Sequence, residues 1–112
     1  MISEADLGEL RALSPDARPH MEAGIEYVFL PQLQMPNGCS PPTVDCLLCL
    51  GARDGYDTRL FFGAVVGCAA QRNWNGVNIR ILERNWFAYS WRVPSGLRPI
   101  ETLINHLNAL RL

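Results

Sequence analysis

The chain has 112 residues, of which 48% are hydrophobic, and its formal net charge is −1. This length predicts a single domain over residues 1–112 with enough apolar material for a core. The near-neutral charge gives no reason to expect nucleic-acid binding. No run approaches the roughly 18 apolar residues of a membrane span, and the acidic start is not a signal peptide. We therefore expect a cytoplasmic protein with no cofactor, whose four cysteines are free thiols.

The charge is unevenly distributed, and all ten basic residues are arginine. Residues 1–56 carry three Arg and eight acids, whereas residues 57–112 carry seven Arg and three acids. The two halves either steer a partner or form surfaces of one domain whose fields largely cancel. The absence of lysine fits arginine-biased codon usage, or a protein that avoids lysine-directed conjugation.

A short helix is expected over residues 1–13, with Ser3 as its N-cap. Leu7, Leu10 and Leu13 fall on one face of this helix, and Pro15 follows its end. Strands are expected next, joined by loops rich in Gly, Pro and Asn. Their expected ranges are residues 24–30, 43–50, 58–66 and 77–81, with residues 86–92 as either a fifth strand or an ordered aromatic coil.

The chain ends in a second helix with Pro99 in its first turn. Its apolar stripe, spaced at three and four residues, consists of Ile100, Leu103, Ile104, Leu107 and Leu110. Consecutive strands with short links predict an antiparallel meander, and the helices must cover one of its faces. The fold class is therefore α+β: a two-layer arrangement of about four strands with an N-terminal and a C-terminal helix.

The four cysteines fall into two kinds of environment. Cys46 and Cys49 lie in an apolar strand, where an offset of three points them to opposite faces, so we expect buried thiols rather than a metal or redox motif. Cys39 and Cys68 lie in loops and are the candidates for chemistry. Arg72 is close enough in sequence to favour a thiolate at Cys68.

Other catalytic patterns are missing from the sequence. His106 lies in the last helix, and no acid or hydroxyl is ordered beside it by sequence, so we expect a boundary histidine. The chain has neither a phosphate-binding loop nor a paired-carboxylate motif. An independent small-molecule enzyme is therefore disfavoured.

The stretch of residues 73–92 concentrates aromatic and arginine side chains. It holds Trp74, Trp86, Trp91, Arg80, Arg84 and Arg92. Trp and Arg are enriched at the energetic centres of protein interfaces, so these residues and Arg72 are candidates for partner binding. The alternative is that Trp86 and Trp91 fill the core, whereas Trp74, flanked by asparagines, is expected to be exposed.

Five motifs carry a family resemblance. They are MPNGC at residues 35–39, VDCLL at 44–48, GYD at 55–57, NWFAYSWR at 85–92 and LRPIETLINHL at 97–107. With the order of helix, strands and helix, the chain resembles prokaryotic E2 family E of bacterial ubiquitin-like conjugation operons. The resemblance implies a UBC (E2) fold, partnership with an E1-like adenylating enzyme and a ubiquitin-like protein, and a link to antiphage defence.

The catalytic pattern of the family is incomplete here. An E2 enzyme carries its modifier as a thioester on a cysteine that follows a His-Pro-Asn motif. Residues 71–76 read QRNWNG instead, and no cysteine follows them. Either Cys68 is the catalytic residue, acting from a rearranged loop, or the chain is a non-catalytic partner that docks an E1-like enzyme or modifier. The alternative is a stand-alone interaction subunit of a defence or toxin–antitoxin operon with an unrelated two-layer α+β fold.

Overall fold

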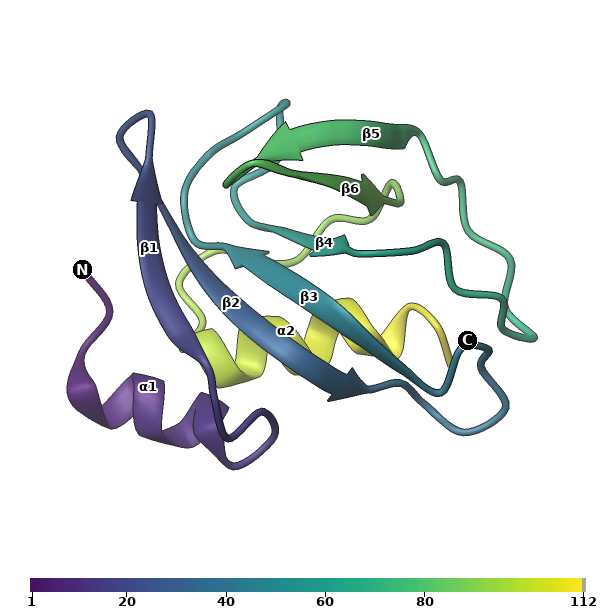
Figure 1. The fold of residues 1–112 in the computed structure, drawn as a ribbon, viewed down its shortest axis with the longest axis horizontal. Coiled ribbons are helices and arrows are strands. Elements are labelled where there is room, and N and C mark those ends of the chain that lie inside the picture. Colours follow the sequence, from purple (N-terminus) through teal and green to yellow (C-terminus); the bar gives the residue numbers. More distant parts are fainter. Residues whose placement is uncertain (112) are drawn as a thin grey trace.

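The structure is a computed structural model that describes residues 1–111. Within these residues the chain forms two helices and one curled six-stranded antiparallel sheet, with strand order β1-β2-β3-β4-β6-β5 (Figure 1). The α+β class is confirmed, although the sheet has six strands rather than about four. The elements are α1 (Glu4–Arg11), β1 (Arg18–Glu22), β2 (Ile25–Gln34), β3 (Thr43–Cys49), β4 (Arg59–Phe62), β5 (Gly76–Ile81), β6 (Arg84–Ala88) and α2 (Pro99–Asn108).

Helix α1 begins as its capping residue predicts. The Ser3 hydroxyl accepts a hydrogen bond of 3.1 Å from the backbone N–H of Asp6. Leu7 and Leu10 are buried, but Leu13 lies beyond the helix and is 43% exposed, so its expected place on the buried face is wrong. The helix ends at Arg11 with Ala12 as its C-cap, so Leu13 lies in the following turn and outside the helical periodicity.

Strand β1 has no counterpart among the expected strands. It forms one edge of the sheet and pairs with β2 from Arg18↔Phe29 to Glu22↔Ile25. Its side chains are almost all exposed, so it lacks the apolar alternation that identifies a strand in sequence. Pro19 is tolerated because edge strands leave some backbone groups unpaired.

The central strand β3 is covered on both faces, as its continuous apolar run predicts. It pairs with β2 and with β4, and its residues from Cys46 to Cys49 are all buried. Strand β2 continues through Pro31 to Gln34, four residues past its expected end, with a register shift between Leu30 and Leu33. Strand β4 is shorter than expected and ends at Phe62.

The last two strands break the expected meander. Strand β5 pairs only with β6 among the described strands, and β6 contacts β4 through Phe62↔Phe87. The order along the sheet is therefore β4-β6-β5, so the expectation of a simple meander is wrong at this edge. The β5–β6 hairpin curls over the other side of the sheet (Figure 1).

This curl produces a second core. The larger core lies between the sheet and the two helices and includes Leu10, Leu48, Phe62 and Leu103. The smaller core lies on the opposite face, where Tyr27, Leu47, Phe61, Ile81 and Trp86 pack together. The two-layer expectation is therefore incomplete, because the hairpin adds a cover on the face that has no helix.

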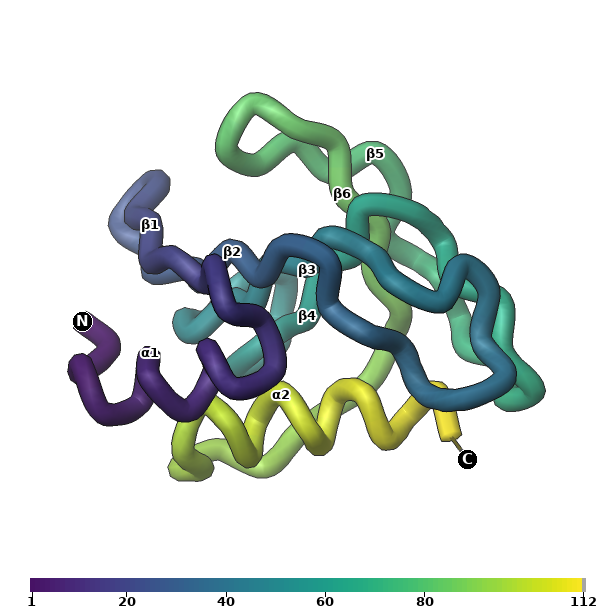
Figure 2. Tube along the Cα trace, turned by 60° about the horizontal axis from the view of Figure 1, so that its bottom comes forward, coloured from purple at the N-terminus to yellow at the C-terminus, as the bar shows by residue number. Residues whose placement is uncertain are grey.

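Helices α1 and α2 lie on the same side of the sheet (Figure 2). Leu103 and Leu107 face the larger core, whereas Ile104 is 45% exposed and Ile100 is half-buried. The expected burial of the whole stripe is thus wrong for Ile104. Within residues 1–111, no helix is both long and apolar enough to cross a membrane.

Candidate functional site

The candidate catalytic residue Cys68 is joined to Cys39 by a disulfide. The expectation of four free thiols is therefore wrong for these two residues, while Cys46 and Cys49 are free and buried. The disulfide links the loop between β2 and β3 to the loop between β4 and β5, across a sequence separation of 29 residues. A disulfide-bonded sulfur cannot form a thiolate, so Cys68 cannot act as a nucleophile while the disulfide is intact.

The two loops also pair through their backbones next to the disulfide. The Ser40 N–H donates to the Gly67 oxygen, and the Gly67 N–H donates to the Ser40 oxygen, both at 2.8 Å. Cys39 and Cys68 are half-buried and pack against the larger core. The two loops are therefore joined by backbone hydrogen bonds as well as by the disulfide.

Part of the aromatic–arginine stretch gathers on the segment that follows Cys68. The Arg72 guanidinium lies 4.9 Å from the centre of the Trp91 ring. Trp74 is half-buried rather than exposed, because its ring lies 5.1 Å from that of Tyr89 and 5.3 Å from that of Phe62. Trp91 and Arg72 are half-buried as well, which leaves part of each side chain accessible to a partner.

The other members of the stretch lie elsewhere. Trp86 is fully buried in the smaller core, with its Nε1 donating to the Ile81 oxygen at 2.9 Å, so its core alternative is confirmed. Arg80 and Arg84 are exposed on the β5–β6 hairpin, where Arg84 pairs with Asp45 at 3.3 Å. Arg92 lies beside Tyr56, with its guanidinium 4.9 Å from that ring. The stretch is therefore divided among three places, the smaller core, the β5–β6 hairpin and the segment around Trp91 and Arg92, and does not form one surface patch.

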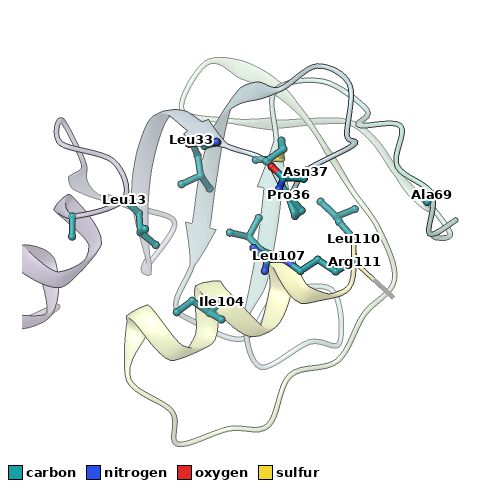
Figure 3. A pocket seen from close by; sticks show the side chains of 12 residues that line it. Leu13, Leu33, Pro36, Asn37, Ala69, Ile104, Leu107, Leu110 and Arg111 are labelled. Carbon is teal, nitrogen blue, oxygen red and sulfur yellow. The ribbon is translucent and has the colours of Figure 1, made fainter.

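A groove that sequence reasoning missed runs along α2. It encloses about 780 Å³ and is lined by residues that include Leu13, Leu33, Met35, Ile104, Leu107 and Leu110 (Figure 3). Pro36, Asn37 and Ala69 also line it, so the two disulfide-linked loops contribute to its rim. Leu13 and Ile104, which were expected on buried apolar faces, are exposed and line this groove.

The free cysteines occupy opposite faces of β3, as their spacing predicts. Cys46 belongs to the larger core and Cys49 to the smaller one. Burial raises the pKa of both thiols, most strongly that of Cys46, where the neighbouring Asp45 carboxylate adds to the effect. Neither has the accessible thiolate that a metal or redox site requires.

His106 is buried rather than placed at the boundary. It is 1% exposed, and its Nε2 lies 3.1 Å from the Thr58 hydroxyl. Burial, with a smaller effect from the charge of Arg59, lowers the pKa of His106 to about 4. The imidazole is therefore neutral at neutral pH and structural in role.

The described side chains offer little for metal chemistry. No group of three or more His, Cys, Asp or Glu residues converges on a possible metal position within residues 1–111.

Comparisons with family models, curated proteins and solved structures find no match to this chain.

Proposed function

We propose that the protein is an E2-like component of a bacterial ubiquitin-like conjugation system that docks an E1-like enzyme or its modifier. The Cys39–Cys68 disulfide is the observation that favours a docking role over thioester transfer. Thioester transfer needs a free thiolate on Cys68, and the disulfide removes it. The order of helix, antiparallel strands and helix supports an E2-like domain, although the position of β6 departs from a simple meander.

The accessible arginine and tryptophan beside this loop supply the docking element of the proposal. Arg72 and Trp91 stack at 4.9 Å and are both half-buried, so they combine a fixed geometry with accessible contact area. Such pairs are typical of interface positions at which truncation weakens binding. In the bacterial cytoplasm, where we place the protein, glutathione and thioredoxin keep most thiols reduced, so the reduced form has to be tested beside the oxidised one.

The test mixes the purified protein with ATP and the E1-like and ubiquitin-like proteins encoded beside its gene. The protein is used in two forms, oxidised and reduced, the latter after removal of the reductant. Non-reducing gels detect a covalent adduct, and calorimetry measures binding. Binding by the oxidised form without an adduct supports docking. An adduct from the reduced form that Cys68→Ala abolishes and Cys39→Ala retains supports the thioester role instead.

Variants locate the interface. Arg72→Ala is expected to weaken binding by about 1 kcal/mol or more, as for other interface anchors. Arg18→Ala, an exposed arginine on β1, is the matched control and should leave binding unchanged. If the protein gives neither binding nor an adduct with these partners, the E2-like assignment is wrong. A stand-alone interaction subunit is then the alternative.

A further inference from the structure

The turn between β3 and β4 is a tight hairpin that presents charged side chains. Arg53 and Tyr56 exchange two backbone hydrogen bonds of 2.9 Å around Asp54 and Gly55. Both central residues have positive φ, 55° for Asp54 and 85° for Gly55, as a two-residue hairpin of this kind requires. Asp and Gly favour this conformation, so the sequence RDGY fixes the turn locally.

Two guanidinium groups meet a single carboxylate at this turn. Asp54 Oδ2 lies 3.2 Å from Arg59 NH1 and 3.4 Å from Arg53 Nε. Arg59 is 4% exposed, and its other terminal nitrogen donates to the Asn75 side-chain oxygen at 2.6 Å. A buried cation is costly unless anionic or polar partners surround it, and here two cations share one such anion.

A third arginine increases the local positive charge. The guanidinium groups of Arg59 and Arg92 lie 4.5 and 4.9 Å from the centre of the Tyr56 ring. Hydrogen bonds to Ser90 and Asn75, followed by the charges of Arg59 and Arg92, lower the pKa of Tyr56. Within the described part of the chain, Asp54 is the only carboxylate in ion-pair contact with any of the three arginines.

The donors of this cluster are not fully used. The Nε of Arg59 is buried and has no hydrogen-bond partner among the described residues, and the Nε of Arg53 makes only the 3.4 Å ion-pair contact with Asp54, without a hydrogen bond. A guanidinium carries five N–H donors in a fork that matches the two oxygens of a carboxylate or phosphate. Asp54 already shows that an oxyanion fits between Arg53 and Arg59, and its side chain is 44% exposed, so this position is open to solvent.

An open pocket adjoins the cluster. It encloses about 410 Å³ and lies between Arg53, Asp54, Tyr56 and Arg59 on one side and Gly76 and Val77 of β5 on the other. Position 76 has no room for a larger side chain, since a Cβ there would lie 2.8 Å from the Ile79 Cδ1. We propose that the pocket binds an oxyanion, a terminal carboxylate or a phosphate group, which Arg53 and Arg59 hold in exchange for Asp54.

The proposal does not depend on the E2-like assignment, and its test uses small anions alone. The probes are inorganic phosphate, and N-acetylglycine with its amide as the uncharged counterpart, titrated at constant ionic strength against chloride. Calorimetry gives the affinity, and the shifts of the Asp54 and Gly55 amide signals in NMR spectra report the position. Saturable binding of phosphate alone identifies a phosphoryl ligand. Binding of N-acetylglycine but not its amide identifies a carboxylate.

Two variants with opposite effects separate binding from a structural role. Arg53→Gln is expected to weaken binding by about tenfold, because it removes a charged donor. Asp54→Asn is expected to strengthen binding several-fold, since it removes the competing carboxylate. A purely structural Asp54 predicts lower stability with no gain in affinity. Arg80→Gln, which removes an exposed charge on β5, is the matched control and should bind like the wild type.

Several results would overturn the proposal. One is that neither anion binds saturably to the wild type or to Asp54→Asn. Another is that Arg53→Gln and Arg80→Gln weaken binding equally, which indicates attraction by bulk charge. Arg59→Gln is left out of the decisive set because Arg59 is buried and the variant risks unfolding. Circular dichroism verifies that every variant used is folded.

Discussion

The Tyr89 hydroxyl donates a hydrogen bond of 2.5 Å to the backbone oxygen of His106. This bond joins the segment after β6 to helix α2, and both residues are buried in the described structure. Burial raises the pKa of Tyr89, so the phenol stays protonated and remains a donor. The imidazole of the same His106 is buried as a neutral group, and its lowered pKa makes stability depend on pH.

His106 should make the protein less stable in mild acid. Its pKa is about 4 in the folded state against an ordinary value of 6.5, so the folded state disfavours the proton. The stability is fully present above about pH 6.5 and declines as the pH falls toward 4, by at most roughly 3 kcal/mol. Denaturant melts between pH 5 and 7 measure this slope. His106→Gln should flatten it and His20→Gln should not; parallel profiles for wild type and His106→Gln would contradict the account.

The Cys39–Cys68 disulfide should stabilise the fold in addition to the apolar core. Loss of a cross-link that closes a loop of this size is expected to cost about 2–4 kcal/mol. Denaturant melts of the wild type with and without reductant test this. The double variant Cys39→Ser/Cys68→Ser is the control, and reductant should not affect it. Equal stability of oxidised and reduced wild type would mean that the hydrogen bonds of the two loops suffice.

Truncating side chains of helix α2 should destabilise the protein on its buried face and have little effect on its exposed face. Leu103→Ala is expected to cost roughly 2–5 kcal/mol, because the side chain is fully buried and its removal leaves a cavity. Ile104→Ala, one residue along, is the matched control and should cost less than about 1 kcal/mol, since that side chain is 45% exposed. A cost well under 1 kcal/mol for Leu103→Ala would show that the helix is not docked.

The two core cysteines should not react with thiol reagents in the native protein. Cys46 and Cys49 are both 0% exposed, so a thiol reagent should label neither in the native state and both after unfolding. Mass spectrometry after proteolysis assigns the labelled sites. Rapid native labelling of either residue, or stoichiometric zinc in the purified protein, would contradict their assignment to the core.

A glycine in the β5–β6 turn should increase the stability of the protein. Leu82 and Glu83 have φ values of 51° and 63°, a conformation that costs a non-glycine residue about 1–2 kcal/mol. Glu83 is exposed, so Glu83→Gly should stabilise the protein by about 1 kcal/mol. The reverse change, Gly55→Ala in the Asp54–Gly55 turn, should destabilise it by a similar amount. Thermal melts that show the same sign for both variants would argue against these turn conformations.

Features governed by neighbours in sequence were predictable. The Ser3 cap, the apolar run of β3 and the spacing of Cys46 and Cys49 each follow from local geometry, and the structure confirms all three. The position of α2 follows from Pro99 and the stripe beyond it. Local periodicity is enough here because caps, turns and alternating faces involve residues only a few positions apart.

Tertiary structure decided what depends on distant pairing. The exposed edge strand β1 carries no periodic signal, and β6 takes its place beside β4 only because the hairpin curls over the second core. The same long-range arrangement joins Cys39 to Cys68 and divides the aromatic–arginine stretch among three places. It also brings Arg59 and Asn75 together beside the Arg53–Tyr56 turn. Residue spacing along the chain does not specify such contacts, because they form only when whole elements pack.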